Sequence, residues 1–318
     1  MTRKKLRLKI NTAGKSYRLH DSPFYKLIKQ SRLLSILCIT SEELSYLRYS
    51  PERYNVFIQK GNNEKERVIE HPREKLEKVH TRIASLMCRI EPPPFLHSGM
   101  KGLSHITNAQ SHSTNSKVLT TDIKSFFPST TREMIFRFFY KTLKCSSNVA
   151  DILADICSVN GHLPTGSRIS MPLAFWVNAE MFFELEKLSN MHDVCMTVYV
   201  DDVTFSGVTI NKLFTKTVKS IISRHGHLMH PRKTVLYKGD DTKVITGVVL
   251  SGSKIAIKNQ QHKKIHEDIL LWKVVRDKYV PASLKNRLLG RLNSLSVVEP
   301  RLKDKARSIK NYKPNPQV

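Results

Sequence analysis

Residues 195–206 read CMTVYVDDVTFS, and this stretch decides the fold. Two apolar arms flank the adjacent acids Asp201 and Asp202, a pattern typical of a β-hairpin. Neighbouring carboxylates on a tight turn are electrostatically costly, since each raises the proton affinity of the other. Such a pair is tolerated where cations neutralise it, although an acidic pair in a hairpin is more often a solvated turn. The stretch by itself leaves both interpretations open.

A third acid, Asp122, lies near the end of another β-branched segment, residues 117–123 (KVLTTDI). If the strands align, their ends bring the three carboxylates together. Carboxylates are suitable hard ligands for two Mg²⁺ ions, with Mn²⁺ as an alternative. Two such ions ~3.5–4 Å apart activate an attacking hydroxyl and stabilise a leaving pyrophosphate. We therefore expect Asp122, Asp201 and Asp202 to bind metal and to be catalytic.

The charge of the chain indicates a polyanionic partner. The 318 residues include 53 Lys and Arg against 27 Asp and Glu, a formal net charge of +26. Residues 1–32 hold ten basic residues and one acid, a net of +9, and residues 254–318 hold sixteen and five, a net of +11. Each neutralised phosphate releases counterions and adds affinity for nucleic acid. A ribosomal-type or merely solubilised basic surface is the alternative. Basic flanks around a nearly balanced centre suit an enzyme core with arms that bind nucleic acid.

The sequence lacks signals for membranes and for structural metal sites. No apolar run approaches the ~18 residues of a membrane span, and the basic N-terminus lacks the apolar stretch of a secretory signal, so we expect a cytosolic protein. The five cysteines are scattered without a CxxC pair, which favours reduced thiols over zinc or disulfides. His225, His227 and His230 lack a neighbouring Cys or acid, so we assign no metal there.

Helical periodicity alternates with short β-branched segments along the chain. Strands are expected at 54–58, 67–69, 117–123, 195–200, 203–206, 244–250 and 254–257. Helices are expected within 24–47 and at 72–90, 133–143, 149–159, 172–188, 211–224, 260–278, 282–296 and 301–312. The polar stretch 99–116 and the Pro-Thr-Gly stretch 164–166 are predicted to be loops. A basic, all-helical tail therefore follows a mixed centre.

With Asp122 in TTDIKSFFPS and YVDD ending at Asp202, the chain resembles reverse transcriptases in their motifs A and C. The resemblance spans residues 50–250 by motif and continues beyond by general pattern. It implies an α+β right-hand polymerase with fingers, a palm built on a ferredoxin-like antiparallel sheet, and a helical thumb. The implied bounds are 1–110 for N-terminal helices and fingers, which also include about 131–165, then 111–250 for the palm and 251–318 for the basic thumb.

Three further segments are similar to family motifs that serve the nucleotide. Arg67 in RVI looks like the fingers arginine that holds the triphosphate, a task that suits a guanidinium fork. Residues 162–166 (HLPTG) with Pro172 look like motif B, which lines the nucleotide and template. Residues 230–234 (HPRKT) look like motif D, which makes Lys233 a catalytic proton donor to pyrophosphate.

The resemblance also assigns roles around these motifs. Phe127 falls at the steric-gate position, where an aromatic ring blocks a 2′-hydroxyl and selects dNTPs, whereas Phe126 is expected to pack beneath the palm. Ile123 joins the three aspartates as an implied metal ligand. The implied nucleotide-binding residues are Arg67, Phe127, Thr165, Gly166 and Tyr199.

Four positions depart from the family pattern. Thr165 stands where motif B usually has Gln, which shortens or removes a nucleotide contact. Val200 replaces the commoner Ala and adds bulk near the primer end. Ser125 stands where a second acid is frequent in motif A, and Met171 interrupts the usual Ser-Pro step. None of these changes removes a metal ligand, so they affect nucleotide affinity and fidelity rather than the chemistry.

Two short motifs narrow the resemblance to retron reverse transcriptases. NAQSH at 108–112 matches the NAxxH motif ahead of motif A, and ITG at 245–247 matches the VTG motif after motif D, with Ile for Val. Asn108, His112, Thr246 and Gly247 are accordingly expected to bind RNA. Asn108 and His112 alternatively satisfy a loop backbone.

A retron enzyme copies its own structured noncoding RNA into branched multicopy single-stranded DNA, primed from the 2′-hydroxyl of an internal guanosine. The implied partners are that RNA, the RNA–DNA hybrid, dNTPs and an effector protein of an antiphage defence system, with no membrane partner. The basic thumb is the candidate to hold an RNA stem through phosphates and 2′-hydroxyls. The alternatives are another bacterial reverse transcriptase, group II intron-like or diversity-generating, and a non-catalytic polymerase-fold RNA-binding protein.

Overall fold

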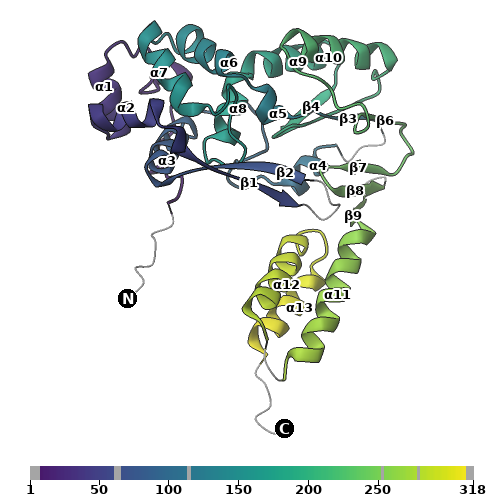
Figure 1. The fold of residues 1–318 in the computed structure, drawn as a ribbon. Coiled ribbons are helices and arrows are strands. Elements are labelled where there is room, and N and C mark those ends of the chain that lie inside the picture. The colour runs from purple at the N-terminus through teal and green to yellow at the C-terminus, as the bar shows by residue number, and fades with distance from the viewer. Residues whose placement is uncertain (1–7, 61–65, 113–115, 252–253, 278–279, 313–318) are drawn as a thin grey trace.

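The computed structural model describes residues 8–60, 66–112, 116–251, 254–277 and 280–312. Figure 1 shows a body of helices and sheets with a helical bundle projecting from it. This mixture of helices and sheets agrees with the α+β fold class that the sequence predicts. Among the described residues, no helix is both long and apolar enough to cross a lipid bilayer.

The N-terminal segment packs helices against a fingers hairpin. It contains η1 (Leu19–Asp21), α1 (Gln30–Leu37), α2 (Ser41–Tyr49), η2 (Pro51–Arg53), strands β1 (Tyr54–Lys60) and β2 (Glu66–Pro72), and α3 (Glu74–Met87). The pattern within 24–47 yields two helices because Cys38 turns into the left-handed region, with φ of 58°. Thr40 and Glu43 then form a reciprocal capping box that starts α2. Strands β1 and β2 pair antiparallel and form what we call the fingers hairpin.

The prediction of a loop over 99–116 is wrong, because the described part of that stretch contains helix α4 (His105–Gln110). Ser104 starts the helix by accepting bonds from the N–H groups of Ile106 and Thr107, at 3.2 and 3.3 Å. The hydroxyl of Thr107 accepts a bond from the Ser104 N–H in return, at 2.8 Å. Thr107 thus takes the place of the usual Glu or Gln of a capping box, which makes the signal weak in sequence.

What we call the palm sheet contains, among the described residues, strands β3 (Lys117–Asp122), β4 (Cys195–Tyr199), β5 (Asp202–Gly207) and β6 (Val235–Tyr237). They run antiparallel in the order β4-β5-β3-β6. The predicted hairpin at 195–206 is therefore present as β4 and β5. Strand β6 was not predicted, since three residues are too few for a periodic signal.

Helices α9 (Ala179–Met191) and α10 (Lys212–Arg224) lie over one face of the palm sheet (Figure 1). The helices between β3 and β6 are α5 (Phe126–Ser129), α6 (Arg132–Arg137) with its π-helical continuation Phe138–Thr142, α7 (Ser147–Cys157), α8 (Ser170–Val177), α9 (Ala179–Met191) and α10 (Lys212–Arg224). The single helix predicted over 172–188 is divided at Asn178. The amide of Asn178 donates to Thr130 Oγ1 and faces His227 Nε2, so tertiary contacts stabilise the break.

A small sheet joins the body to the bundle. Its described strands are β7 (Lys243–Ile245), β8 (Val248–Ser251) and β9 (Lys254–Ile257), all antiparallel. The single strand predicted over 244–250 is wrong, because Thr246 and Gly247 form a turn with φ of 44° and 86°. The Thr246 hydroxyl donates to the His105 carbonyl at 2.7 Å, which ties this turn to α4.

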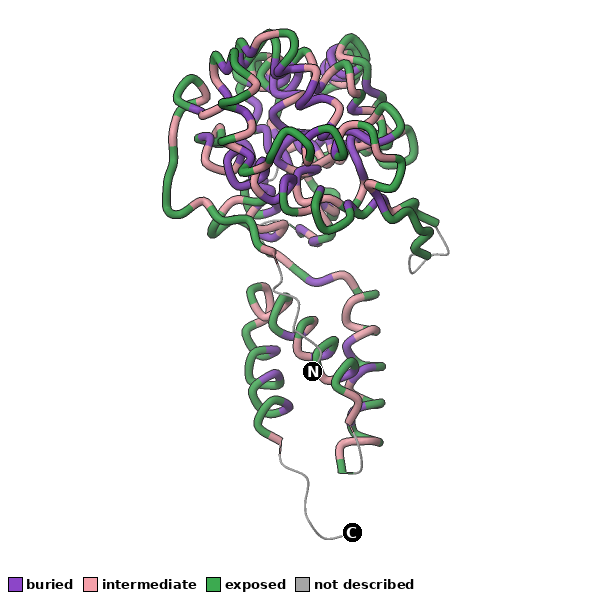
Figure 2. The backbone as a smooth tube through the Cα atoms, turned by 60° about the vertical axis from the view of Figure 1, so that its left-hand side comes forward, coloured by how far each residue is buried: buried purple, intermediate pink, exposed green. Residues whose placement is uncertain are grey.

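Within residues 254–277 and 280–312, the chain forms helices α11 (Asn259–Val275), α12 (Ala282–Leu295) and α13 (Arg301–Asn311), which we call the thumb. The prediction of these helices is confirmed, although the predicted end of α11 at Lys278 lies outside the described residues. Leu288, Leu292 and Trp272 belong to an apolar core of the thumb itself. Figure 2 shows buried residues concentrated in the body and on the facing sides of the thumb helices.

Candidate active site

The palm sheet brings the three predicted aspartates to one edge. Asp122 ends β3 and is the cross-strand partner of Asp202, which begins β5. The Ile123 N–H donates to the Asp201 carbonyl at 2.9 Å, which fixes the turn against the end of β3. Residues 79 positions apart in the chain therefore meet because the two strands run antiparallel in this register.

The turn that carries Asp201 has a strained but supported backbone. Val200 has φ of 62°, a left-handed conformation that is costly for a β-branched residue. Its N–H donates to Ser98 Oγ at 3.0 Å. Ser98 follows a segment that runs beside β4, where Val198 N–H donates to the Phe95 carbonyl at 2.8 Å. The sequence analysis missed Ser98, because nothing local marks a contact across about 100 positions.

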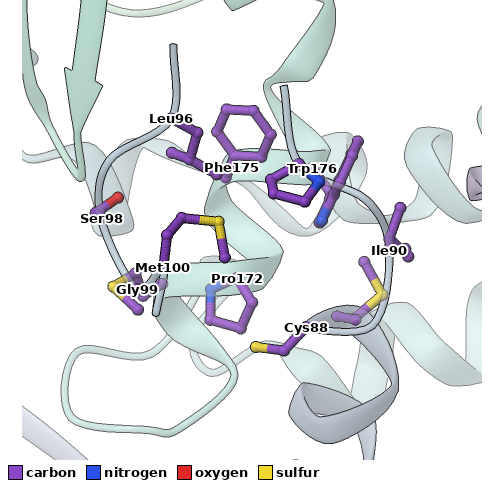
Figure 3. A pocket seen from close by; sticks show the side chains of 12 residues that line it. Cys88, Ile90, Leu96, Ser98, Gly99, Met100, Pro172, Phe175 and Trp176 are labelled. Atoms are coloured by element: carbon purple, nitrogen blue, oxygen red, sulfur yellow. The ribbon is translucent and has the colours of Figure 1, made fainter. Parts of the chain in front are cut away.

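Ser98 also lines an apolar cavity between the chain near Met100 and helix α8, where Phe175 and Trp176 contribute ring surfaces (Figure 3). The segment that contains Ser98 is thus held by backbone bonds to β4 and also borders the apolar side chains of this cavity.

Electrostatics in the site favour a bound cation. Burial, followed by the charges of Asp201 and Asp122, raises the pKa of Asp202 from 3.8 to about 6. Burial and the charge of Asp122 likewise raise the pKa of Asp201. The ammonium of Lys233 contacts an oxygen of the buried Asp122 and partly offsets the negative charge. The site still holds more carboxylates than ammonium groups, which costs free energy unless a cation binds.

Among the described residues, no three His, Cys, Asp or Glu side chains are grouped so that they could hold a metal ion. One oxygen of Asp122 contacts the ammonium of Lys233 instead. The donors themselves fit hard divalent cations, since they are carboxylates with raised proton affinity beside the main chain of Ile123. A cation would bind at Asp122, Asp201 and Asp202 in competition with Lys233.

The segment predicted to be motif D lies beside β3. The His230 N–H donates to the Asp122 carbonyl at 2.7 Å, and the hydroxyls of Thr234 and Thr121 are 2.8 Å apart. These contacts bring Lys233 to the carboxylates. A cavity of about 270 Å³ adjoins them, with Asp202, Lys233, Tyr237, Thr246, Gly247 and Lys258 in its lining. Thr246 and Gly247 are thus near the carboxylates and open to a ligand.

The implied nucleotide residues have different surroundings. The charge of Arg67, on β2, lowers the pKa of Asp201, so Arg67 is electrostatically coupled to the site. The hydroxyl of Thr165 donates to the Val68 carbonyl at 2.6 Å and therefore faces the fingers hairpin. Phe126 is buried and packs edge-on against Phe182, as predicted, whereas Phe127 is half-buried beside it. Tyr199 ends β4 and is also half-buried.

Asn108 and His112, which the sequence assigns to RNA, have side chains that are 1% and 0% exposed. The ring of His112 bonds to Ser206 Oγ and to Thr197 Oγ1, both at 2.7 Å, and so links α4 to β4 and β5. Burial lowers the pKa of His112 to about 3, which keeps the ring neutral. The NAxxH-like segment thus packs against the hairpin formed by β4 and β5 and supports it through these bonds.

The histidine cluster of residues 225–230 is dispersed among separate partners. His225 faces Glu184 at 2.9 Å, and His227 lies between Ser129 and Asn178. The rings of His225 and His227 therefore bond to separate partners.

Comparisons with known proteins supply the family relationship. No family model matches the chain. The Retron Ec86 reverse transcriptase of Escherichia coli is 26% identical over 237 residues, 73% of this chain and 74% of that protein. The Retron Ec48 reverse transcriptase of Escherichia coli is 24% identical over 310 residues, 89% of this chain and 75% of that protein. The retron reverse transcriptase Se72 of Salmonella heidelberg is 24% identical over 59% of this chain and 50% of that protein.

Among solved structures, a foamy viral protease–reverse transcriptase in complex with double-stranded DNA aligns with a TM-score of 0.48 and 15% identity. The alignment covers 98% of this chain and 49% of the viral one. The sequence similarity to retron enzymes carries the relationship.

Proposed function

From the premise that this chain is a homologue of the retron reverse transcriptases, and hence an RNA-directed DNA polymerase, we propose that it copies its own structured noncoding RNA into branched multicopy single-stranded DNA. Synthesis would start from the 2′-hydroxyl of an internal guanosine. The observation that carries this proposal is the meeting of Asp122, Asp201 and Asp202 at one edge of the palm sheet. Raised proton affinity at Asp201 and Asp202 suits carboxylates that await cations.

We assign Mg²⁺, with Mn²⁺ as the alternative, to the three aspartates and the main chain of Ile123. Two bound ions would supply Lewis-acid activation of the priming hydroxyl and charge stabilisation at the pyrophosphate. Bound cations would compete with Lys233 for Asp122, and we assign Lys233 the role of proton donor to pyrophosphate. Arg67 binds the triphosphate through its guanidinium fork, which presents paired donors to phosphate oxygens.

The nucleic-acid partners follow from charge and position. The segment 254–318 carries a net charge of +11 and contains the thumb helices. This charge suits phosphate contacts with an RNA stem or the hybrid product. Thr246 and Gly247 lie between the carboxylates and the thumb and are assigned to the priming strand or its RNA. An effector protein within an antiphage defence system is the further partner that we propose. Residues 1–110 with 131–165, then 111–250 and 251–318, are assigned as fingers, palm and thumb.

Replacement of Asp201 by Asn tests the site. Primer extension on an RNA template with Mg²⁺ should fall by ~10³-fold or more, because a metal ligand is lost without a change of shape. The matched control is Asp193→Asn, an exposed acid before β4, which should leave activity within ~2-fold. Equal activity of wild type and Asp201→Asn would remove the proposed site. Inactivity of the wild type on every template would favour the non-catalytic RNA-binding protein.

Phe127→Val tests sugar selection. Loss of the ring should reduce the preference for dNTPs over NTPs by ~10-fold or more, because the clash with a 2′-hydroxyl disappears. The measurement is the ratio of kcat/KM for dGTP and GTP in single-nucleotide incorporation. Phe183→Val, a partly exposed ring on α9, serves as the control. Unchanged sugar selectivity would refute the steric-gate role.

Sequencing of RNA that copurifies with the protein, expressed with its flanking DNA, separates the polymerase alternatives. A self-folding RNA encoded beside the gene supports a retron. An intron RNA or a variable-region transcript would instead support the other bacterial types.

A further inference from the structure

Three side chains join the motif B loop to the fingers hairpin. Glu70, on β2, is 4% exposed, and its carboxylate accepts a bond from the Thr165 N–H at 3.0 Å. The same carboxylate lies 3.1 Å from His162 Nε2. The Thr165 hydroxyl reaches the Val68 carbonyl at 2.6 Å. We call Glu70, His162 and Thr165 the fingers latch.

The main chains of the two segments also meet directly. The Glu70 N–H donates to the Thr165 carbonyl at 2.6 Å. The next residue, Gly166, has φ of 116°, and a Cβ there would lie 2.8 Å from Ile69 Cγ2. Only glycine allows the loop to approach β2 this closely. The contact is therefore a built junction between loop and strand, with both backbone and side-chain bonds.

The latch holds a part of the fingers hairpin that has few contacts with the apolar core. Val56, Ile58 and Val68 are 54%, 60% and 54% exposed, so the apolar core contributes little to fixing the strands there. Arg67 lies on β2 next to Val68, whose carbonyl the latch binds. A bond at Val68 and three at Glu70 thus fix the part of β2 that follows Arg67.

We propose that the fingers latch positions Arg67 over the catalytic aspartates, and that Thr165 acts through this strand rather than as a ligand of the nucleotide. The inference rests on the proposed function, since it concerns how the same site binds a triphosphate. It also accounts for the departure from motif B. A glutamine is long enough to reach into the site, whereas the short hydroxyl of Thr165 bonds to the neighbouring strand.

The test compares Thr165→Val, which keeps the shape and removes the hydroxyl, with Thr165→Ser, which keeps the hydroxyl. In single-nucleotide incorporation, Thr165→Val should raise the KM for dNTP by ~10-fold and leave kcat within ~2-fold. Thr165→Ser should stay within ~2-fold of wild type in both constants. Thr209→Val removes an equivalent bond, from a hydroxyl to the His192 carbonyl, far from the site and serves as the matched control.

Hydrogen–deuterium exchange of the segment 66–72 provides a readout that does not depend on catalysis. Exchange should accelerate ~10-fold in Thr165→Val and in Glu70→Gln, but not in Thr165→Ser or Thr209→Val. A raised KM without faster exchange would make Thr165 a direct nucleotide ligand and overturn the latch. Unchanged KM and exchange in Thr165→Val would overturn it as well. Inactive wild-type protein would refute the proposed function, while the exchange data still decide whether the latch exists.

Discussion

The palm and the thumb treat buried aspartates in opposite ways. In the thumb, Asp268 on α11 is 3% exposed and is bound by two guanidinium groups. Arg287 donates through Nη2 and Nε at 2.8 and 3.1 Å, and Arg291 contacts the other oxygen. In the palm, the charge of Asp122 raises the pKa of both Asp201 and Asp202, and the charge of Asp201 raises that of Asp202 further.

The difference distinguishes a structural charge from a functional one. Asp268 is neutralised within the protein, so it links α11 to α12 and needs no ligand. The palm carboxylates stay undercompensated, which destabilises the fold without a cation and reserves their charge for one. Substitution should therefore have opposite effects on stability in the two regions.

Asp268→Ala should give the largest change in stability. It leaves Arg287 and Arg291 without their shared anion and should destabilise the thumb by ~2–3 kcal/mol. The guanidinium groups are partly exposed and regain water, which keeps the cost at the low end. Chemical denaturation followed by hydrogen exchange in α12 measures the effect. Asp304→Ala, an exposed acid paired with Arg307, is the control and should cost less than ~0.5 kcal/mol. Equal costs at both positions would break the comparison.

Asp202→Asn should instead increase the stability of the metal-free protein. Because the folded-state pKa is raised to about 6, ionisation of Asp202 opposes folding. The cost is fully present above pH 6 and disappears as the pH falls towards the ordinary value of 3.8. With EDTA at pH 7, the variant should be more stable than wild type by ~1–2 kcal/mol, and by much less at pH 4. A variant less stable than wild type at pH 7 would contradict this account.

Ser98→Ala should give the smallest of the three effects. It tests the palm without a change of charge, because it removes only a hydrogen bond to the backbone of the turn. The Val200 N–H loses its acceptor, so the catalytic turn should become less ordered. We expect kcat to fall by ~3–10-fold, equivalent to ~1 kcal/mol, with RNA affinity unchanged. Ser296→Ala removes a serine hydroxyl bond in the thumb and is the matched control. No difference between the two variants would mean that Ser98 does not position the turn.

The local sequence pattern predicted the helices and strands whose apolar residues recur at a regular spacing. The thumb helices and the strands around Asp122, Asp201 and Asp202 were found because their apolar residues recur at 3.6 or 2 positions. Helix α4 and the turn at Thr246 and Gly247 were missed, because one has an unusual cap and the other lies inside a continuous apolar run.

The acidic residues of the candidate site could be predicted from the sequence, whereas the residues that support them through tertiary contacts could not. An acidic pair in an apolar hairpin is visible in sequence, whereas the Ser98 bond to Val200 joins residues about 100 positions apart. His112 is assigned to RNA through the match of residues 108–112 to the NAxxH motif, and only the structure reveals its hydrogen bonds to Thr197 and Ser206. The Thr165 contact with Val68 likewise depends on tertiary approach.

The thumb has its own apolar core, and Val298 is a partly buried side chain that contacts both this core and the one around Ile245 and Val248. Ile257 of β9 also belongs to the thumb core, yet the two cores remain separate clusters, so we expect the coupling between the two units to be weaker than within either core. Heating should then produce two calorimetric transitions, and the ratio of calorimetric to van't Hoff enthalpy should exceed one. A single melting temperature would describe neither unit, and bound nucleic acid that spans both would merge the transitions into one.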